Sequence, residues 1–135
     1  LGDVYKRQLQ KNRDTLYVQA MQEYLKRLGK YCTIEVKYVK KEKQLGRIFE
    51  KEGKHFMVTS SENSMESTAF AEEISRWMMN GCSNIFFYIG GFRPEHDVSE
   101  FSVSSFDMAP ELCAAVLLEQ IYRSCRIMNC QPYHK

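Results

Sequence analysis

Apolar residues recur at intervals of three and four along several stretches of the chain, which is the spacing of one helical face. In one stretch Phe70, Ile74 and Trp77 share such a face. Another begins at Pro110, a residue suited to the first helical position. These patterns predict helices at residues 14–28, 67–80 and 110–128, with a shorter one in the basic segment 40–51.

Other stretches have the pattern of strands. Residues 33–39 alternate with period two and are rich in β-branched and aromatic residues, and residues 85–89 form an apolar run of strand length. Strands are predicted at residues 33–39, 55–59, 84–89 and 101–106. Since strands alternate with helices, the expected fold is α/β, with a mostly parallel sheet and helices on both faces.

Ligands bind beyond the carboxyl ends of the strands in such sheets. That rule points to residues 59–64, to Gly90-Gly91 with the loop after them, and to residues 106–110. The two glycines let a backbone approach a ligand closely, or they form a tight turn. Neither a G-x-G-x-x-G fingerprint nor a P-loop lysine is present, so classical dinucleotide binding and nucleoside triphosphate hydrolysis have no support.

A length of 135 residues indicates one domain, which we place at residues 9–135. The leader, residues 1–8, is polar and has no signal-peptide core, so we expect a non-native or disordered segment and a sheet that lacks a strand. No apolar run is long enough to span a membrane, and a cytoplasmic location is the expectation.

Charge is unevenly distributed, although the formal net charge is only +2. Residues 1–55 hold 14 Lys and Arg against 7 Asp and Glu, whereas residues 56–135 hold 5 against 10. The basic half is either a surface that faces phosphates or a solvated helical face with a basic loop.

Five scattered cysteines indicate reduced thiols. Cys125, Cys130 and His134 have the spacing of a metal half-site, but a fourth ligand is missing nearby, so no metal is predicted.

The last predicted helix is apolar nearly all round, which in a small chain indicates a partner subunit. Within it, Glu119 and Arg123 are either a buried pair or site residues. The tail after this helix ends in Tyr133, His134 and Lys135. Such a tail is either disordered or able to stack on an unpaired RNA base while the lysine contacts phosphate.

The C-terminal segment resembles a known family. Residues 118–127, followed by the terminal Pro-Tyr-His-Lys of residues 132–135, are similar to the end of the ribosomal RNA large subunit methyltransferase H family. Residues 23–28, Ser67 with the apolar residues after it, and residues 87–91 agree with the same family, so the resemblance covers roughly residues 15 to 135.

This resemblance implies a SPOUT-like α/β fold with a C-terminal trefoil knot, a homodimer, and S-adenosyl-L-methionine (AdoMet) as cofactor. It implies methyl transfer to N3 of a pseudouridine in large-subunit (23S) ribosomal RNA, free or in the assembled ribosome. The catalytic residues carried over are Arg123, Tyr133 and His134. Those expected to bind the cofactor are Val58, Thr59, Ile89, Gly90, Gly91, Ser105, Phe106, Asp107 and Met108.

The chain departs from the family at three segments near the expected cofactor pocket. Residues 58–62 lack the usual Asp and Gly, the loop after Gly91 is short and has no adjacent Pro, and residues 107–110 lack a His. The methyltransferase is the expected function, and because of these departures an alternative stays open: a non-catalytic homodimer of the same fold that binds RNA or the ribosome and has a degraded pocket. A third reading is an unrelated α/β dimer that binds a small molecule.

Overall fold

The computed structural model describes residues 3–7, 15–39, 46–60, 65–81, 84–90, 98–104, 106 and 108–129, with only the backbone described for residues 3–7 and Thr15. Strands and helices alternate along most of the chain. Their order is β1 (Asp3–Arg7), α1 (Thr15–Leu28), β2 (Glu35–Val39), α2 (Gly46–Phe49), β3 (Lys54–Ser60), α3 (Ser67–Met79), β4 (Ile85–Ile89), β5 (Ser99–Ser104) and α4 (Pro110–Met128).

The strands form one five-stranded sheet in the order β2-β1-β4-β3-β5. Each neighbouring pair is parallel, so the carboxyl ends of all the strands lie at one edge. The apolar strand β4 is buried along its whole length, as a strand covered on both faces must be. The predicted α/β fold with a parallel sheet is therefore confirmed.

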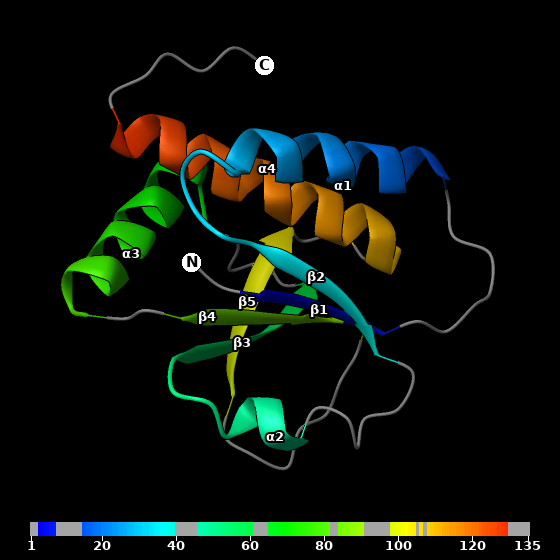
Figure 1. Ribbon diagram of the computed structural model, residues 1–135, viewed down its shortest axis with the longest axis horizontal. Coiled ribbons are helices and arrows are strands. Elements are labelled where there is room, and N and C mark those ends of the chain that lie inside the picture. The colour runs from blue at the N-terminus through cyan, green and yellow to red at the C-terminus, as the bar shows by residue number, and fades with distance from the viewer. Residues whose placement is uncertain are drawn as a thin grey trace.

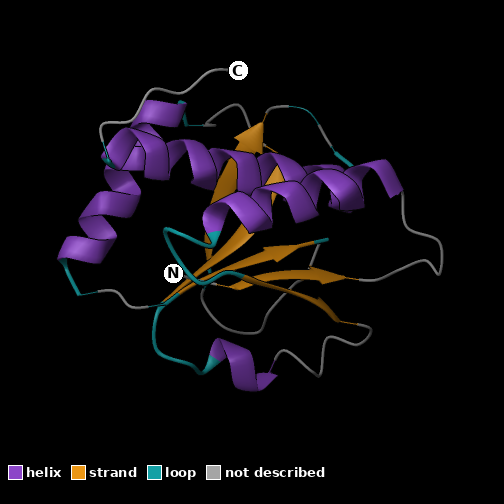
Figure 2. Ribbon diagram, turned by 45° about the horizontal axis from the view of Figure 1, so that its top comes forward, coloured by secondary structure: helices purple, strands orange, loops and turns teal. Residues whose placement is uncertain are grey.

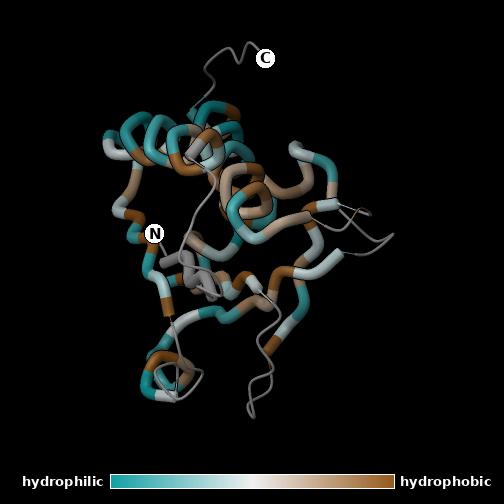
Figure 3. The backbone as a smooth tube through the Cα atoms, turned by 90° about the vertical axis from the view of Figure 1, so that its right-hand side faces the viewer, coloured by the Kyte–Doolittle hydropathy of each residue, from teal (hydrophilic) through white to brown (hydrophobic). Residues whose placement is uncertain are grey.

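Helices cover both faces of the sheet, as Figures 1 and 2 show. The helices α1, α3 and α4 pack on one face and enclose the main core, whereas α2 lies against the other face. Hydrophobic and hydrophilic residues alternate along the helices in Figure 3, which is the pattern of helices with one covered side. The predicted bounds of α4 match at both ends, because Pro110 starts the helix and Asn129 caps its last turn.

The core on the α2 side contains a buried polar link. Tyr88 is fully buried, and its hydroxyl lies 2.7 Å from Nδ1 of His55. The other ring nitrogen of His55, Nε2, donates to the carbonyl of Lys51 at 2.8 Å. Because a carbonyl only accepts, neutral His55 carries its proton on Nε2, and Nδ1 accepts the hydroxyl proton of Tyr88. The ring also stacks on Phe86 at 4.5 Å, so His55 fixes the start of β3 against β4.

Strand β1 corrects one part of the prediction made for the leader, namely that the sheet lacks a strand. Residues 3–7 pair with β2 on one side and β4 on the other, so the sheet has the strand that it was expected to lack. The physical reason is that β2 and β4 each present a row of backbone donors and acceptors, which a polar segment can satisfy without apolar side chains. That residues 1–8 are a non-native or disordered leader stays a prediction.

Strand β5 also differs from its prediction, since it spans 99–104 rather than 101–106. Phe106 lies beyond the strand with 78% of its surface exposed, and its backbone N–H donates to Oγ of Ser104 at 3.0 Å. That serine turns the chain away from the sheet. Among the described residues, no helix has the length and apolar character needed to cross a membrane.

Candidate active site

A cavity of about 430 Å³ opens at the carboxyl edge of the sheet. We call it the strand-end cavity. Its walls come from the ends of β3, β4 and β5 and from the first turn of α4. The lining residues are Val58, Thr59, Ser60, Ile89, Gly90, Val103, Phe106, Met108, Pro110 and Cys113.

Local geometry explains why these segments converge. Gly90 follows β4 with a φ of 110°, a conformation that L side chains rarely adopt, so the chain turns out of the sheet there. Phe106 stands at the turn after β5, and Pro110 starts α4 at the cavity wall. Cys113 is one helical turn further on and therefore faces the same side as Pro110.

The structure brings together the described members of the predicted cofactor set. Val58, Thr59, Ile89, Gly90, Phe106 and Met108 all line the strand-end cavity. The other predicted members, Gly91, Ser105 and Asp107, lie outside the described residues, as do Tyr133 and His134.

Sequence reasoning missed part of the lining. Ser60 and Pro110 fall within the segments that the strand-end rule marked, but neither was chosen as a binding residue. Val103 lies inside β5 and Cys113 inside α4. Both line the cavity because the carboxyl end of β5 and the first turn of α4 form part of its wall. For Cys113, a spacing of one turn after Pro110 was the available signal.

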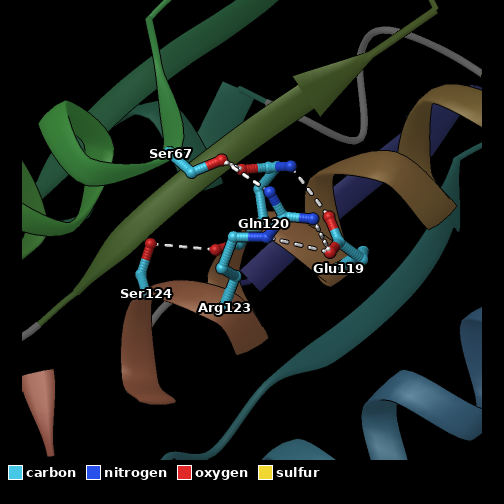
Figure 4. A network of polar contacts seen from close by, with 5 residues as sticks. All are labelled: Ser67, Glu119, Gln120, Arg123 and Ser124. Atoms are coloured by element: carbon cyan, nitrogen blue, oxygen red, sulfur yellow. Dashed lines mark hydrogen bonds and ion pairs between the residues drawn. The ribbon is translucent and has the colours of Figure 1, made fainter. Parts of the chain in front are cut away.

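Arg123 lies in a separate network of polar contacts, shown in Figure 4. Its guanidinium donates to Oε1 of Glu119 from Nη2 at 2.7 Å and from Nε at 3.2 Å. Its Nη1 donates to Oγ of Ser67 at 3.0 Å. The Ser67 hydroxyl donates to Oε1 of Gln120 at 2.7 Å, and the amide of Gln120 donates to Oε2 of Glu119 at 2.8 Å. The four side chains thus close a ring.

This ring joins the first residue of α3 to the middle of α4. The side chains of Arg123 and Glu119 are 19% and 16% exposed, so solvent screens their attraction only partly. Arg123 is ten positions after Cys113 on α4, which corresponds to about 15 Å along the helix. Arg123 is therefore held in a fixed orientation, at a distance from the strand-end cavity along its own helix.

The thiols of Cys32, shortly after α1, and Cys125 on α4 interact with each other. Hydrogen bonding between the two thiols lowers the pKa of Cys32 and raises that of Cys125. Within the described part of the chain, no group of three or more His, Cys, Asp or Glu side chains could hold a metal ion.

A parallel α/β sheet with a ligand-sized cavity at its strand ends is the architecture of proteins that bind a small ligand or cofactor there. The model of the family described as predicted SPOUT methyltransferase matches residues 8–134. The chain belongs to this family, and it is therefore a methyltransferase.

Within that class, similar proteins share one name. The chain is 31% identical to "Ribosomal RNA large subunit methyltransferase H" of Anaeromyxobacter sp. (strain K), over 93% of this chain and 94% of the relative. It is 31% identical to the protein of that name from Enterococcus faecalis, with the same coverage. A "Putative ribosomal RNA large subunit methyltransferase H" of Methanococcus maripaludis is 33% identical, over 86% of this chain and 89% of that protein. The resemblance to this family seen in the sequence is thus confirmed.

Proposed function

We propose that this protein methylates large-subunit (23S) ribosomal RNA at N3 of a pseudouridine, with AdoMet as the methyl donor. The observation that carries the proposal is the strand-end cavity, where residues from separate predicted segments meet in a chain of the SPOUT methyltransferase family. The names of the similar proteins support ribosomal RNA of the large subunit as the substrate.

The strand-end cavity suits AdoMet in size and chemistry. Its volume of about 430 Å³ is within the range of small-molecule sites, roughly 300–1,000 Å³. Val58, Ile89 and Val103 supply apolar walls for an adenine ring, and the hydroxyls of Thr59 and Ser60 offer partners for ribose. Gly90 leaves backbone open to a close approach.

AdoMet supplies an electrophilic methyl group on a sulfonium. The chain's own contribution would be to orient the bound donor toward N3 of the target base, so that the N–C bond forms as the S–C bond breaks, the demethylated product leaves with the electron pair on sulfur, and the N3 proton passes to water. Orientation of this kind accounts for a large part of the rate. The apolar part of the cavity wall would reduce the contact of a bound donor with water.

The proposal includes the finer features that the resemblance implies. The protein works as a cytoplasmic homodimer, its C-terminal part forms a trefoil knot, and Tyr133, His134 and Arg123 face the RNA or the target base. The ring of hydrogen bonds around Arg123 supports this role, since it fixes the guanidinium before any substrate arrives.

Calorimetric titration with AdoMet and its demethylated product tests the cofactor site. Replacing Ser60 by tryptophan at the cavity wall should weaken AdoMet binding by at least tenfold. The matched control is Ser99→Trp, because Ser99 is also exposed on a strand but lies at the opposite, amino end of β5.

The activity itself is tested by transfer of radiolabelled methyl from AdoMet to ribosomes that lack the modification. Methylation by the wild type and its loss in Ser60→Trp are expected. If the wild-type protein does not bind AdoMet, the proposed enzymatic function is rejected. The alternative, a non-catalytic homodimer that binds RNA, would then be better supported.

A further inference from the structure

Cationic and aromatic side chains gather where the last turns of α1 run beside α4. The two helices lie side by side on the same face of the sheet (Figures 1 and 2). We call this cluster the α1–α4 basic surface and define it by Tyr24, Arg27, Lys30, Tyr31, Tyr122 and Arg126.

In the α1–α4 basic surface, tyrosine rings lie close to one another and the cations lie over these rings. The ring of Tyr122 lies 6.1 Å from that of Tyr24 and 6.2 Å from that of Tyr31, measured between centroids. The guanidinium of Arg27 lies 5.7 Å from the Tyr24 centroid and 5.8 Å from the Tyr122 centroid. Contacts of this kind orient a cation and leave its charge in place.

Two further cations extend the surface. Lys30 lies 5.2 Å from the centroid of Tyr31, and Arg126 lies 6.0 Å from that of Tyr122. The cations thus come from both helices, and the tyrosine rings link them into one patch.

Within this patch Arg27 keeps its charge and remains accessible. The Arg27 side chain is 50% exposed. Glu23 accepts the Nε–H of Arg27 at 3.0 Å, and the guanidinium carries further donors on its terminal nitrogens. This hydrogen bond raises the pKa of Arg27, so the cation persists at any physiological pH.

We propose that the α1–α4 basic surface binds the phosphate backbone of the RNA substrate. Fixed cations with several donors match phosphate oxygens, and contacts of this kind position a protein on RNA without reading its sequence. The inference rests on the proposed function for the identity of the RNA, but it concerns a surface away from the strand-end cavity.

Chain continuity supports RNA as the partner. Arg126 is three residues before the end of the described chain, and the segment that carries Tyr133 and His134 continues directly from there. A span of about seven residues reaches at most about 25 Å. The tail could therefore contact a base that lies near the phosphates bound at the α1–α4 basic surface, within the same RNA stem-loop.

The test is a variant with Arg27, Lys30 and Arg126 all replaced by glutamine. Its binding to a large-subunit ribosomal RNA transcript is followed by fluorescence anisotropy over a series of salt concentrations. Each phosphate contact contributes about 0.7 to 0.9 to the slope of log affinity against log salt concentration, so the slope should fall by about two to three. The single Arg27→Gln variant, at a half-exposed site, should lower it by about one.

The matched control replaces Lys37, Lys54 and Arg76 by glutamine, which removes the same net charge elsewhere. Lys37 and Arg76 are 45% and 60% exposed and paired with carboxylates, as Arg27 is. Lys54 lies 6.0 Å from the ring centroid of Trp77, a contact like those of the α1–α4 basic surface. The control should change the slope by less than one.

Each outcome separates this inference from the proposed function. Equal slopes for the two triple variants would overturn the inference alone, provided that the wild type still binds AdoMet and methylates RNA. Conversion of the test variant to a monomer in sedimentation would also overturn it, since the surface would then contact a second copy of the chain. RNA binding that depends on this surface in a protein unable to bind AdoMet would reject the proposed function alone.

Discussion

Replacing Glu119 by glutamine removes the negative charge from the ring of hydrogen bonds that holds Arg123. In the native protein one carboxylate oxygen accepts two N–H groups of Arg123, and the other accepts the amide of Gln120. The glutamine keeps the shape of the side chain and one acceptor, but Arg123 is then a mostly buried cation without its counter-charge.

The magnitude follows from burial. Fully exposed ion pairs contribute about 0 to 1 kcal/mol, and breaking a fully buried pair costs about 3 to 5 kcal/mol. With side chains 19% and 16% exposed, the pair of Arg123 and Glu119 lies between these limits. We expect Glu119→Gln and Arg123→Met each to lower the free energy of unfolding by about 2 kcal/mol, and the double variant to lose little more.

Urea unfolding of the wild type, both single variants and the double variant gives the coupling energy directly. Protein concentration is held constant, because association of subunits would add to apparent stability. The exposed pair of Arg76 and Glu73, with side chains 60% and 25% exposed, serves as the control and should couple by about 0.5 kcal/mol or less. A coupling this small for Arg123 and Glu119 as well would refute the argument that burial strengthens their pair.

Two further predictions concern other parts of the fold. A Cβ added to Gly53 would stand 2.5 Å from the carbonyl oxygen of Asn84, and Gly53 has a φ of 141°, so Gly53→Ala should destabilise the protein by about 2 kcal/mol or more in thermal unfolding. Gly46→Ala has open space and should change stability by less than about 1 kcal/mol in the same measurement; equal effects would contradict this account. Because the hydrogen bond with Cys125 lowers the pKa of Cys32, Cys125→Ala should move the pH profile of Cys32 alkylation by iodoacetamide to higher pH. An unchanged profile, read by peptide mass spectrometry, would show that the two thiols do not interact.

Much of this fold could be predicted because its signals are local. Helix α4 has a proline at its start and an uninterrupted apolar pattern, and β4 is an apolar run of strand length. The strand-end cavity was predictable for a related reason: once strands and helices alternate, the carboxyl ends of parallel strands must meet at one edge. Neither inference needed knowledge of which strands are neighbours.

Features that depend on neighbours could not be predicted. The polar segment of β1 is a strand because β2 and β4 leave backbone groups to be paired on both sides, and its own composition does not reveal this. Likewise, the helical spacing of Glu119 and Arg123 indicated a pair, but Ser67 belongs to a different helix more than fifty positions away. Only packing of α3 against α4 brings its hydroxyl to Arg123.

Helix α4 is where the proposed roles of this protein meet. Its first turn closes the strand-end cavity, its middle carries Glu119 and Arg123, and its last turns bring Tyr122 and Arg126 beside α1. Each role therefore makes a separate demand on the helix: an open N-terminal end for a cofactor, a fixed arginine, and an exposed C-terminal end for phosphates. If the proposals hold, substitutions at the two ends should separate AdoMet affinity from RNA affinity, whereas a change at Arg123 should lower the rate of methylation without weakening AdoMet binding.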